Sequence, residues 1–119
     1  MKKTLIIGAS TNPARYAYIA AHRLVTYQHP IELLGLKEGE VAGNLIKTGK
    51  PFLENIDTVT LYIGPQHQPE WYDYVLTLKP KRVIFNPGTE NPEFQQILLQ
   101  HNIEALEACT LVLLSTGAF

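Results

Sequence analysis

Residues 3–15 have the sequence Lys3-Thr4-Leu5-Ile6-Ile7-Gly8-Ala9-Ser10-Thr11-Asn12-Pro13-Ala14-Arg15, which predicts a buried strand, a tight turn and the start of a helix. The apolar run 5–7 is typical of a central parallel strand that is covered on both faces. Gly8 ends this run, and because it has no Cβ it allows a sharp turn and the close approach of a ligand. Asn12 and Pro13 favour a helix start, because Asn caps free N–H groups and Pro at the first helical position loses only an unpaired N–H.

A helix that starts beside the end of a strand offers unpaired N–H groups and a partial positive charge to an anion. Ser10, Thr11 and Arg15 add donors around this turn, so the sequence predicts a phosphate-binding strand-turn-helix. The glycine-containing motifs known to bind nucleotides or to hold a catalytic serine are only partly matched by this turn. The dinucleotide pattern G-x-G-x-x-G has only Gly8, the P-loop ending is absent, and the nucleophile pattern G-x-S-x-G lacks its last glycine. An ordinary turn without a ligand is the alternative.

The composition predicts a single domain, residues 1–119, with an ordinary core, because 45% of the residues are hydrophobic. A net charge of −1 argues against a protein that holds nucleic acid or an anionic membrane surface by bulk charge. No stretch has the length of a transmembrane helix, and the apolar segment near Met1 is too short for a secretory signal. The lone cysteine, Cys109, excludes an internal disulfide and fits the reducing cytoplasm.

Strands and helices alternate along the chain. The apolar patterns predict strands over residues 5–7, 31–36, 58–63, 82–85 and 103–106, and helices over 13–28, 70–78 and 92–101. This order predicts a Rossmann-like, doubly wound parallel α/β sheet of about five strands. The loop 37–51 is too rich in glycine for a full crossover helix, and residues 108–114 favour a short helix that packs back on the sheet.

Lys37 and the segment 86–93 are also predicted to lie at the carboxyl ends of strands. Dinucleotide enzymes place an acidic residue after the second strand to bind a ribose hydroxyl, whereas this chain has Lys37. A lysine there favours a phosphate near the ribose and disfavours NAD, although a solvated loop lysine is the alternative. The segment Asn86-Pro87-Gly88-Thr89-Glu90-Asn91-Pro92-Glu93 repeats the pattern of the first turn. Both turns are therefore expected to face one crevice.

These segments, in this order, resemble the family of small stand-alone CoA-binding domains, which are similar to the nucleotide-binding domain of the succinyl-CoA synthetase alpha subunit. The resemblance is carried by residues 8–13, 35–37, 59–65, 86–91 and 103–109 and covers nearly the whole chain. It implies a Rossmann-like sheet that binds CoA or an acyl-CoA across the strand ends, without evident catalytic residues. The chain ends before the synthetase's second domain, which carries the phosphorylated histidine, so ligase activity is not implied.

The resemblance also implies which residues contact the ligand. Lys37 would lie by the ribose phosphate, and Gly64 and Pro65 would line the adenine or pantetheine side. In the first turn, the residues that would contact the CoA phosphates are Gly8, Ala9, Ser10, Thr11, Asn12 and Arg15. After the fourth predicted strand, the residues that would line the crevice toward the thiol end of CoA are Asn86, Gly88 and Glu90.

Other chemistry has less support in the sequence. The four histidines lack the spacing of metal ligands, and only His67, after the third strand, is a crevice candidate. Cys109 lies in an apolar stretch, which is more typical of a buried small side chain than of a thiol that pairs with CoA. The alternatives are an oxidoreductase or transferase subunit with an NAD(P)-type cofactor, and an interaction module that has lost its ligand. Aromatic side chains of the helix around Trp71 would suit a homodimer contact.

Overall fold

The centre of the fold is strand β1, Thr4–Ala9. The structure is a computed structural model that describes all residues, 1–119. Along β1, successive side chains point to opposite faces of the sheet, so that Leu5 and Ile7 join one buried cluster and Ile6 joins the other. The apolar run is thus buried on both faces, as expected for a central parallel strand.

Six further strands flank β1. They are β2 (Ile31–Gly35), β3 (Gly39–Val41), β4 (Asn44–Lys47), β5 (Thr58–Leu61), β6 (Arg82–Phe85) and β7 (Glu104–Glu107). The order across the sheet is β3-β4-β2-β1-β5-β6-β7, and every neighbouring pair is parallel except the hairpin β3–β4. The strand order changes direction between β1 and β5, which is where ligands bind in open α/β sheets.

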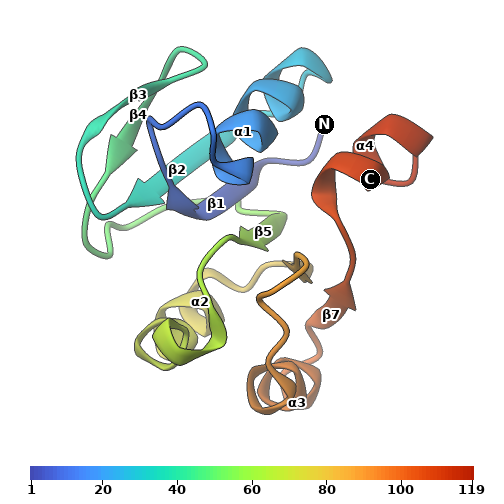
Figure 1. The fold of residues 1–119 in the computed structure, drawn as a ribbon. Coiled ribbons are helices and arrows are strands. Elements are labelled where there is room, and N and C mark those ends of the chain that lie inside the picture. Colours follow the sequence, from blue (N-terminus) through green and yellow to red (C-terminus); the bar gives the residue numbers. More distant parts are fainter.

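Helices cover both faces of the sheet (Figure 1). α1 (Tyr16–Thr26) and α4 (Thr110–Thr116) lie on one face, and α2 (Tyr72–Leu78) and α3 (Pro92–Gln100) lie on the other. Two short 3-10 helices, η1 (Pro65–His67) and η2 (Pro69–Trp71), precede α2. The chain is therefore a single compact α/β domain, and none of its helices has the length and apolar character needed to span a membrane.

The sheet has seven strands, whereas the sequence predicts about five. The two unpredicted strands form the hairpin β3–β4 within the glycine-rich segment 37–51. Both residues of its turn have a positive φ, 52° at Ala42 and 76° at Gly43, as the favoured two-residue hairpin turns require. Alanine is uncommon in such a turn and β3 has only three residues, so neither the turn nor the periodicity reveals the hairpin in the sequence.

Between β4 and β5 the chain crosses the sheet without a helix. Leu53 and Ile56 of this crossing are buried in the cluster under α2 and α3. The carbonyl of Pro51 accepts a hydrogen bond from the Tyr74 hydroxyl of α2 at 2.7 Å. The loop thus supplies the apolar cover that a crossover helix normally gives.

Helix α1 begins later than the sequence predicts. Asn12 is expected to cap a helix that starts at Pro13, but α1 starts at Tyr16, its N-cap residue is Arg15, and no side chain caps it. Asn12 instead closes a local turn, because its Oδ1 accepts from the Ala14 N–H at 3.0 Å and its carbonyl accepts from the Arg15 N–H at 3.0 Å. The other predicted helices and strands are present, β6 with the predicted bounds and the others with shifted ends.

Candidate functional site

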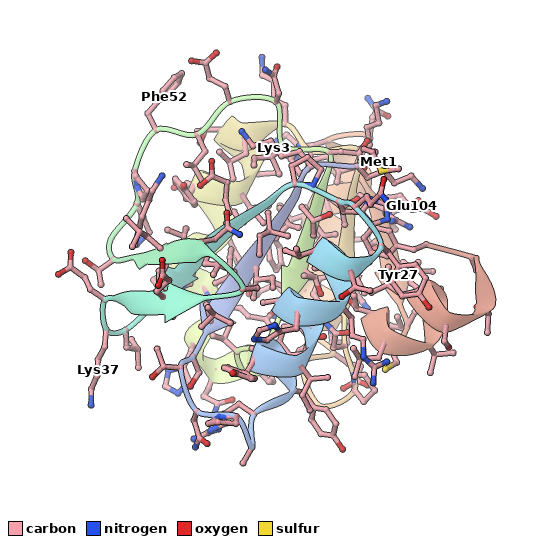
Figure 2. All side chains as sticks on the ribbon, turned by 90° about the horizontal axis from the view of Figure 1, so that it is seen from above. Met1, Lys3, Tyr27, Lys37, Phe52 and Glu104 are labelled. Carbon is pink, nitrogen blue, oxygen red and sulfur yellow. The ribbon has the colours of Figure 1, made fainter.

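A cleft of about 800 Å³ opens at the carboxyl ends of β1, β2, β5 and β6. Its walls come from residues 8–12 and 14–17 at the end of β1 and after it, 36–37 after β2, 62–64 and 67 after β5, and 87–89 after β6. Figure 2 shows Lys37 at this edge of the molecule, at the end opposite Lys3, which precedes β1. The volume lies within the range of pockets that hold cofactors and other small ligands, and the place is the one where open α/β sheets bind them.

The first turn leaves hydrogen-bond donors open at this cleft. Because α1 starts at Tyr16 without a side-chain cap, the N–H groups of Tyr16 and Ala17 have no acceptor within the protein. Ser10 holds the turn, since its Oγ accepts from the Asn12 N–H at 3.0 Å. The positive end of an 11-residue helix with unpaired N–H groups favours a bound anion.

The charged side chains of the cleft are basic. Arg15 and Lys37 line it, both are exposed, and neither takes part in the ion pairs of the protein. His67 also lines the cleft, as the sequence suggests, and no aspartate or glutamate does. Because the whole chain has a net charge of −1, the positive cleft is a local arrangement. Such an arrangement suits a phosphorylated ligand.

Two glycines lie in close contact with neighbouring segments at the first turn. Gly8 has a φ of +100°, and a Cβ on it would lie 2.7 Å from the carbonyl oxygen of Tyr62. A Cβ on Gly39 of the hairpin would lie 2.6 Å from Cγ2 of Thr11. The end of β5 and the hairpin therefore both pack directly against the first turn. This close packing requires Gly8 whatever lies in the cleft.

The structure brings most of the residues expected at the crevice to the lining of this cleft and leaves three outside it. The lining includes Gly8, Ala9, Ser10, Thr11, Asn12, Arg15, Lys37, Gly64 and Gly88. The three outside it are Pro65, Asn86 and Glu90.

Asn86 turns into the protein, away from the cleft, and is 3% exposed. Its Nδ2 donates to Thr60 Oγ1 at 2.6 Å and to the Leu61 carbonyl at 2.9 Å, and its Oδ1 accepts from the Thr110 N–H at 2.9 Å. It thereby joins the ends of β5 and β6 to the start of α4. Glu90 is also occupied within the protein, because its Oε1 accepts from the Gly88 N–H at 2.9 Å.

Gln68, which the sequence does not single out, joins two walls of the cleft. Its side chain is fully buried, and its Nε2 donates to the carbonyls of Ile63 at 3.0 Å and Thr89 at 2.7 Å. Its Oε1 accepts from Asn91 Nδ2 at 3.0 Å. In the sequence Gln68 is indistinguishable from an exposed loop residue, because two of its three partners, Thr89 and Asn91, lie 21 and 23 residues further along the chain.

Tyr62 forms a neutral, half-buried part of the cleft wall. Burial raises the pKa of its hydroxyl to about 12, although hydrogen bonds with the side chains of Thr110 and Thr60 act in the opposite direction. Seven other lining residues are not among those that the sequence assigns to the crevice, namely Ala14, Tyr16, Ala17, Leu36, Ile63, Pro87 and Thr89.

Cys109 lies outside the cleft lining. It is a free thiol, half-buried, at the N-cap of α4. The structure holds no group of three or more His, Cys, Asp or Glu side chains that could bind a metal ion.

Comparison with known proteins gives the following matches. A family model described as CoA binding domain matches residues 2–115. No curated protein matches the chain. Among solved structures, an uncharacterized protein shares 55% sequence identity with a TM-score of 0.97, and the match covers 100% of this chain and 98% of that one.

Two further structures share the fold at low identity. A protein from Thermus thermophilus has 21% identity and a TM-score of 0.88, with 99% of this chain and 90% of that chain covered. A hypothetical protein from Pyrococcus horikoshii OT3 has 23% identity and a TM-score of 0.84, with coverages of 93% and 80%.

Proposed function

This chain belongs to the CoA-binding domain family, and on that premise we propose that it binds CoA or an acyl-CoA in the cleft at the carboxyl ends of its sheet. One observation carries the proposal. The uncapped start of α1 and two cations without ion-pair partners, Arg15 and Lys37, lie in a single cleft that has no acidic side chain. CoA carries a diphosphate and a ribose 3′-phosphate, so it needs positive charge at two places.

The first turn is the proposed site of the diphosphate. Ser10, Thr11 and Asn12 lie at its surface, and the free N–H groups at the start of α1 lie beside them. Arg15 adds a fixed charge next to these donors. Lys37, which follows β2, is then placed to bind the ribose phosphate, in agreement with its position in the family pattern.

The pantetheine arm is proposed to cross the ends of β5 and β6. The wall there has the half-buried ring of Tyr62 and the backbone of Gly64 and Gly88, and it contains no fixed charge. A Cβ on Gly88 would meet nothing within 4 Å, so this residue borders open space. An uncharged wall of this kind suits a neutral amide chain.

We also propose that the domain holds its cofactor for a partner and does not transform it. The Ser10 Oγ in the cleft already accepts from the Asn12 N–H. It makes no hydrogen bond with His67, the side chain of the cleft that could act as its base, and no carboxylate lines the cleft.

Calorimetric titration of the purified protein with CoA, dephospho-CoA and NAD at one salt concentration tests the proposal. We expect saturable binding with preference for CoA, and tighter binding of NAD would favour a nucleotide-dependent oxidoreductase instead. Arg15→Ala should weaken CoA binding roughly tenfold, the order expected for a lost charged contact. Arg23→Ala is the matched control, because Arg23 is exposed near the other end of the same helix and outside the cleft. Absence of binding to all three ligands would refute the function.

A further inference from the structure

Two large apolar side chains at the cleft are left uncovered. Leu36 is 99% exposed and Tyr16 is 71% exposed, and both line the cleft. No other exposed large apolar residue of the chain does so. Each is the sequence neighbour of one of the cleft's fixed cations, since Arg15 precedes Tyr16 and Lys37 follows Leu36.

The fold does not use either side chain. Neither belongs to the two buried clusters or to the half-buried residues packed against them. Tyr16 starts α1 outside its buried stripe, and Leu36 follows Gly35, the last residue of β2. Because both residues are dispensable for the core and face the cleft, their apolar surface is available to a ligand.

The neighbouring cations, Arg15 and Lys37, indicate which part of the ligand contacts these two apolar side chains. Adenosine 3′,5′-bisphosphate, the nucleotide half of CoA, has a flat apolar base on a ribose with phosphates at two positions. This side of the cleft pairs apolar side chains with two cations in the same way, whereas the side formed by residues 62–64 and 87–89 has no fixed charge.

We infer that Tyr16 and Leu36 bind the adenine base of CoA and set the preference of this site for a purine nucleotide. The inference rests on the proposed function. Tyr16 supplies an aromatic ring on which the base can stack, and Leu36 supplies an aliphatic surface that contact with the base removes from water. A loss of about tenfold in affinity is therefore expected when either side chain is replaced by alanine.

The test separates the two halves of the ligand. Tyr16→Ala and Leu36→Ala are titrated with CoA, with adenosine 3′,5′-bisphosphate and with 4′-phosphopantetheine. Both variants should lose about tenfold in affinity for CoA and for the bisphosphate, and they should bind phosphopantetheine as the wild type does. Tyr16→Phe, which keeps the ring, should bind the bisphosphate as the wild type does.

Matched controls lie outside the cleft. Tyr27→Ala removes a 45% exposed tyrosine just beyond the other end of α1, and Leu45→Ala removes a 67% exposed leucine of β4. Neither should change any of the three affinities.

The outcomes distinguish this inference from the proposed function. Selective loss of phosphopantetheine binding, or unchanged binding of all ligands in both alanine variants, would overturn the adenine assignment and leave CoA binding intact. A wild type that binds the bisphosphate but not CoA, with the loss at Tyr16 and Leu36, would support the base contact and refute CoA as the ligand. A wild type that binds none of the three would overturn both.

Discussion

The turn after β1 and the turn after β6 have similar sequences but use their polar groups in opposite ways. Each follows a parallel strand and contains an Asn-Pro pair, Asn12-Pro13 in the first and Asn91-Pro92 in the second. Asn12 is exposed, and all its hydrogen bonds, with Ser10 Oγ and with the N–H groups of Ala14 and Arg15, stay within its own turn. Asn91 is 7% exposed, caps α3 by accepting from the Phe94 N–H at 3.1 Å, and donates to two further side chains.

The difference comes from what lies behind each turn. Behind the second turn, Gln68 and the Tyr72 hydroxyl accept hydrogen bonds from the Asn91 amide. The first turn has no such partners, so its side chains stay at the surface and α1 begins only after Arg15. An Asn-Pro pair therefore signals a turn, and tertiary contacts decide whether a helix starts there. The satisfied turn is scaffold, and the unsatisfied turn is open to a ligand.

The largest effect on stability is expected at Gln68. Gln68→Leu leaves the carbonyls of Ile63 and Thr89 without their donor and removes one of the two acceptors of the Asn91 amide, and it should lower the free energy of unfolding by about 3 kcal/mol. Urea denaturation measures this. Gln66→Leu, at an exposed position of η1, is the control and should change stability by no more than about 0.5 kcal/mol. Equal effects of the two substitutions would show that Gln68 does not hold the second turn.

The comparison is tested most directly by the two asparagines. Asn91→Ala removes the α3 cap and leaves a buried N–H unpaired, which should lower stability by about 2 kcal/mol. Asn12→Ala should change stability by at most about 0.5 kcal/mol, because Asn12 is exposed and caps no helix. Denaturation of both variants gives the values. If Asn12→Ala were as costly as Asn91→Ala, the two turns would not differ as the structure indicates.

The sequence is sufficient to predict the elements that local patterns specify. The apolar run 5–7, the Asn91 cap and the short helix near the C-terminus all depend on neighbouring residues, and all are present. The arrival of Lys37 and the first turn at one cleft follows from parallel topology, which alternating strands and helices imply.

The sequence is insufficient where an outcome depends on distant partners. Asn86 was expected to face the crevice, but Thr60 and Thr110 draw its amide inward, and nothing near it in the sequence reveals them. The same holds for Gln68. The hairpin β3–β4 is not predicted from the sequence for a different reason. Its turn places Ala42 in a conformation that L residues other than Asn and Asp rarely adopt.

A charge reversal at Lys37 tests whether the part of the cleft that follows β2 binds the ribose phosphate of CoA. Lys37→Glu should weaken CoA binding about tenfold, and dephospho-CoA binding much less, because the added negative charge acts mainly on the ribose phosphate. Calorimetry at one salt concentration compares the two ligands. Lys79→Glu makes the same charge change at an exposed site outside the cleft and should leave both affinities unchanged. Equal losses of both ligands would remove Lys37 from this role.

Tyr62 lies between the two turns, and its titration makes the stability of the protein depend on pH at high pH. The backbone N–H of Tyr62 donates to the Ile7 carbonyl, just before the first turn. Its hydroxyl interacts with the side chains of Thr60 and Thr110, and both threonines also form hydrogen bonds with Asn86 of the second turn. Because burial raises the pKa of Tyr62 to about 12 in the folded protein, the unfolded chain loses this proton first, near pH 10.

This linkage fixes the sign of the pH effect. The contribution of Tyr62 to stability is complete below pH 10 and falls as the pH rises toward 12. Urea denaturation between pH 9 and 12 should therefore show a shallower decline for Tyr62→Phe than for the wild type. The other tyrosines with a raised pKa, Tyr72 and Tyr74, are present in both proteins and cancel in the comparison. Identical declines would mean that the Tyr62 hydroxyl is open to solvent. The hydrogen bonds around Asn86 in the second turn would then not extend to Tyr62 in the cleft wall.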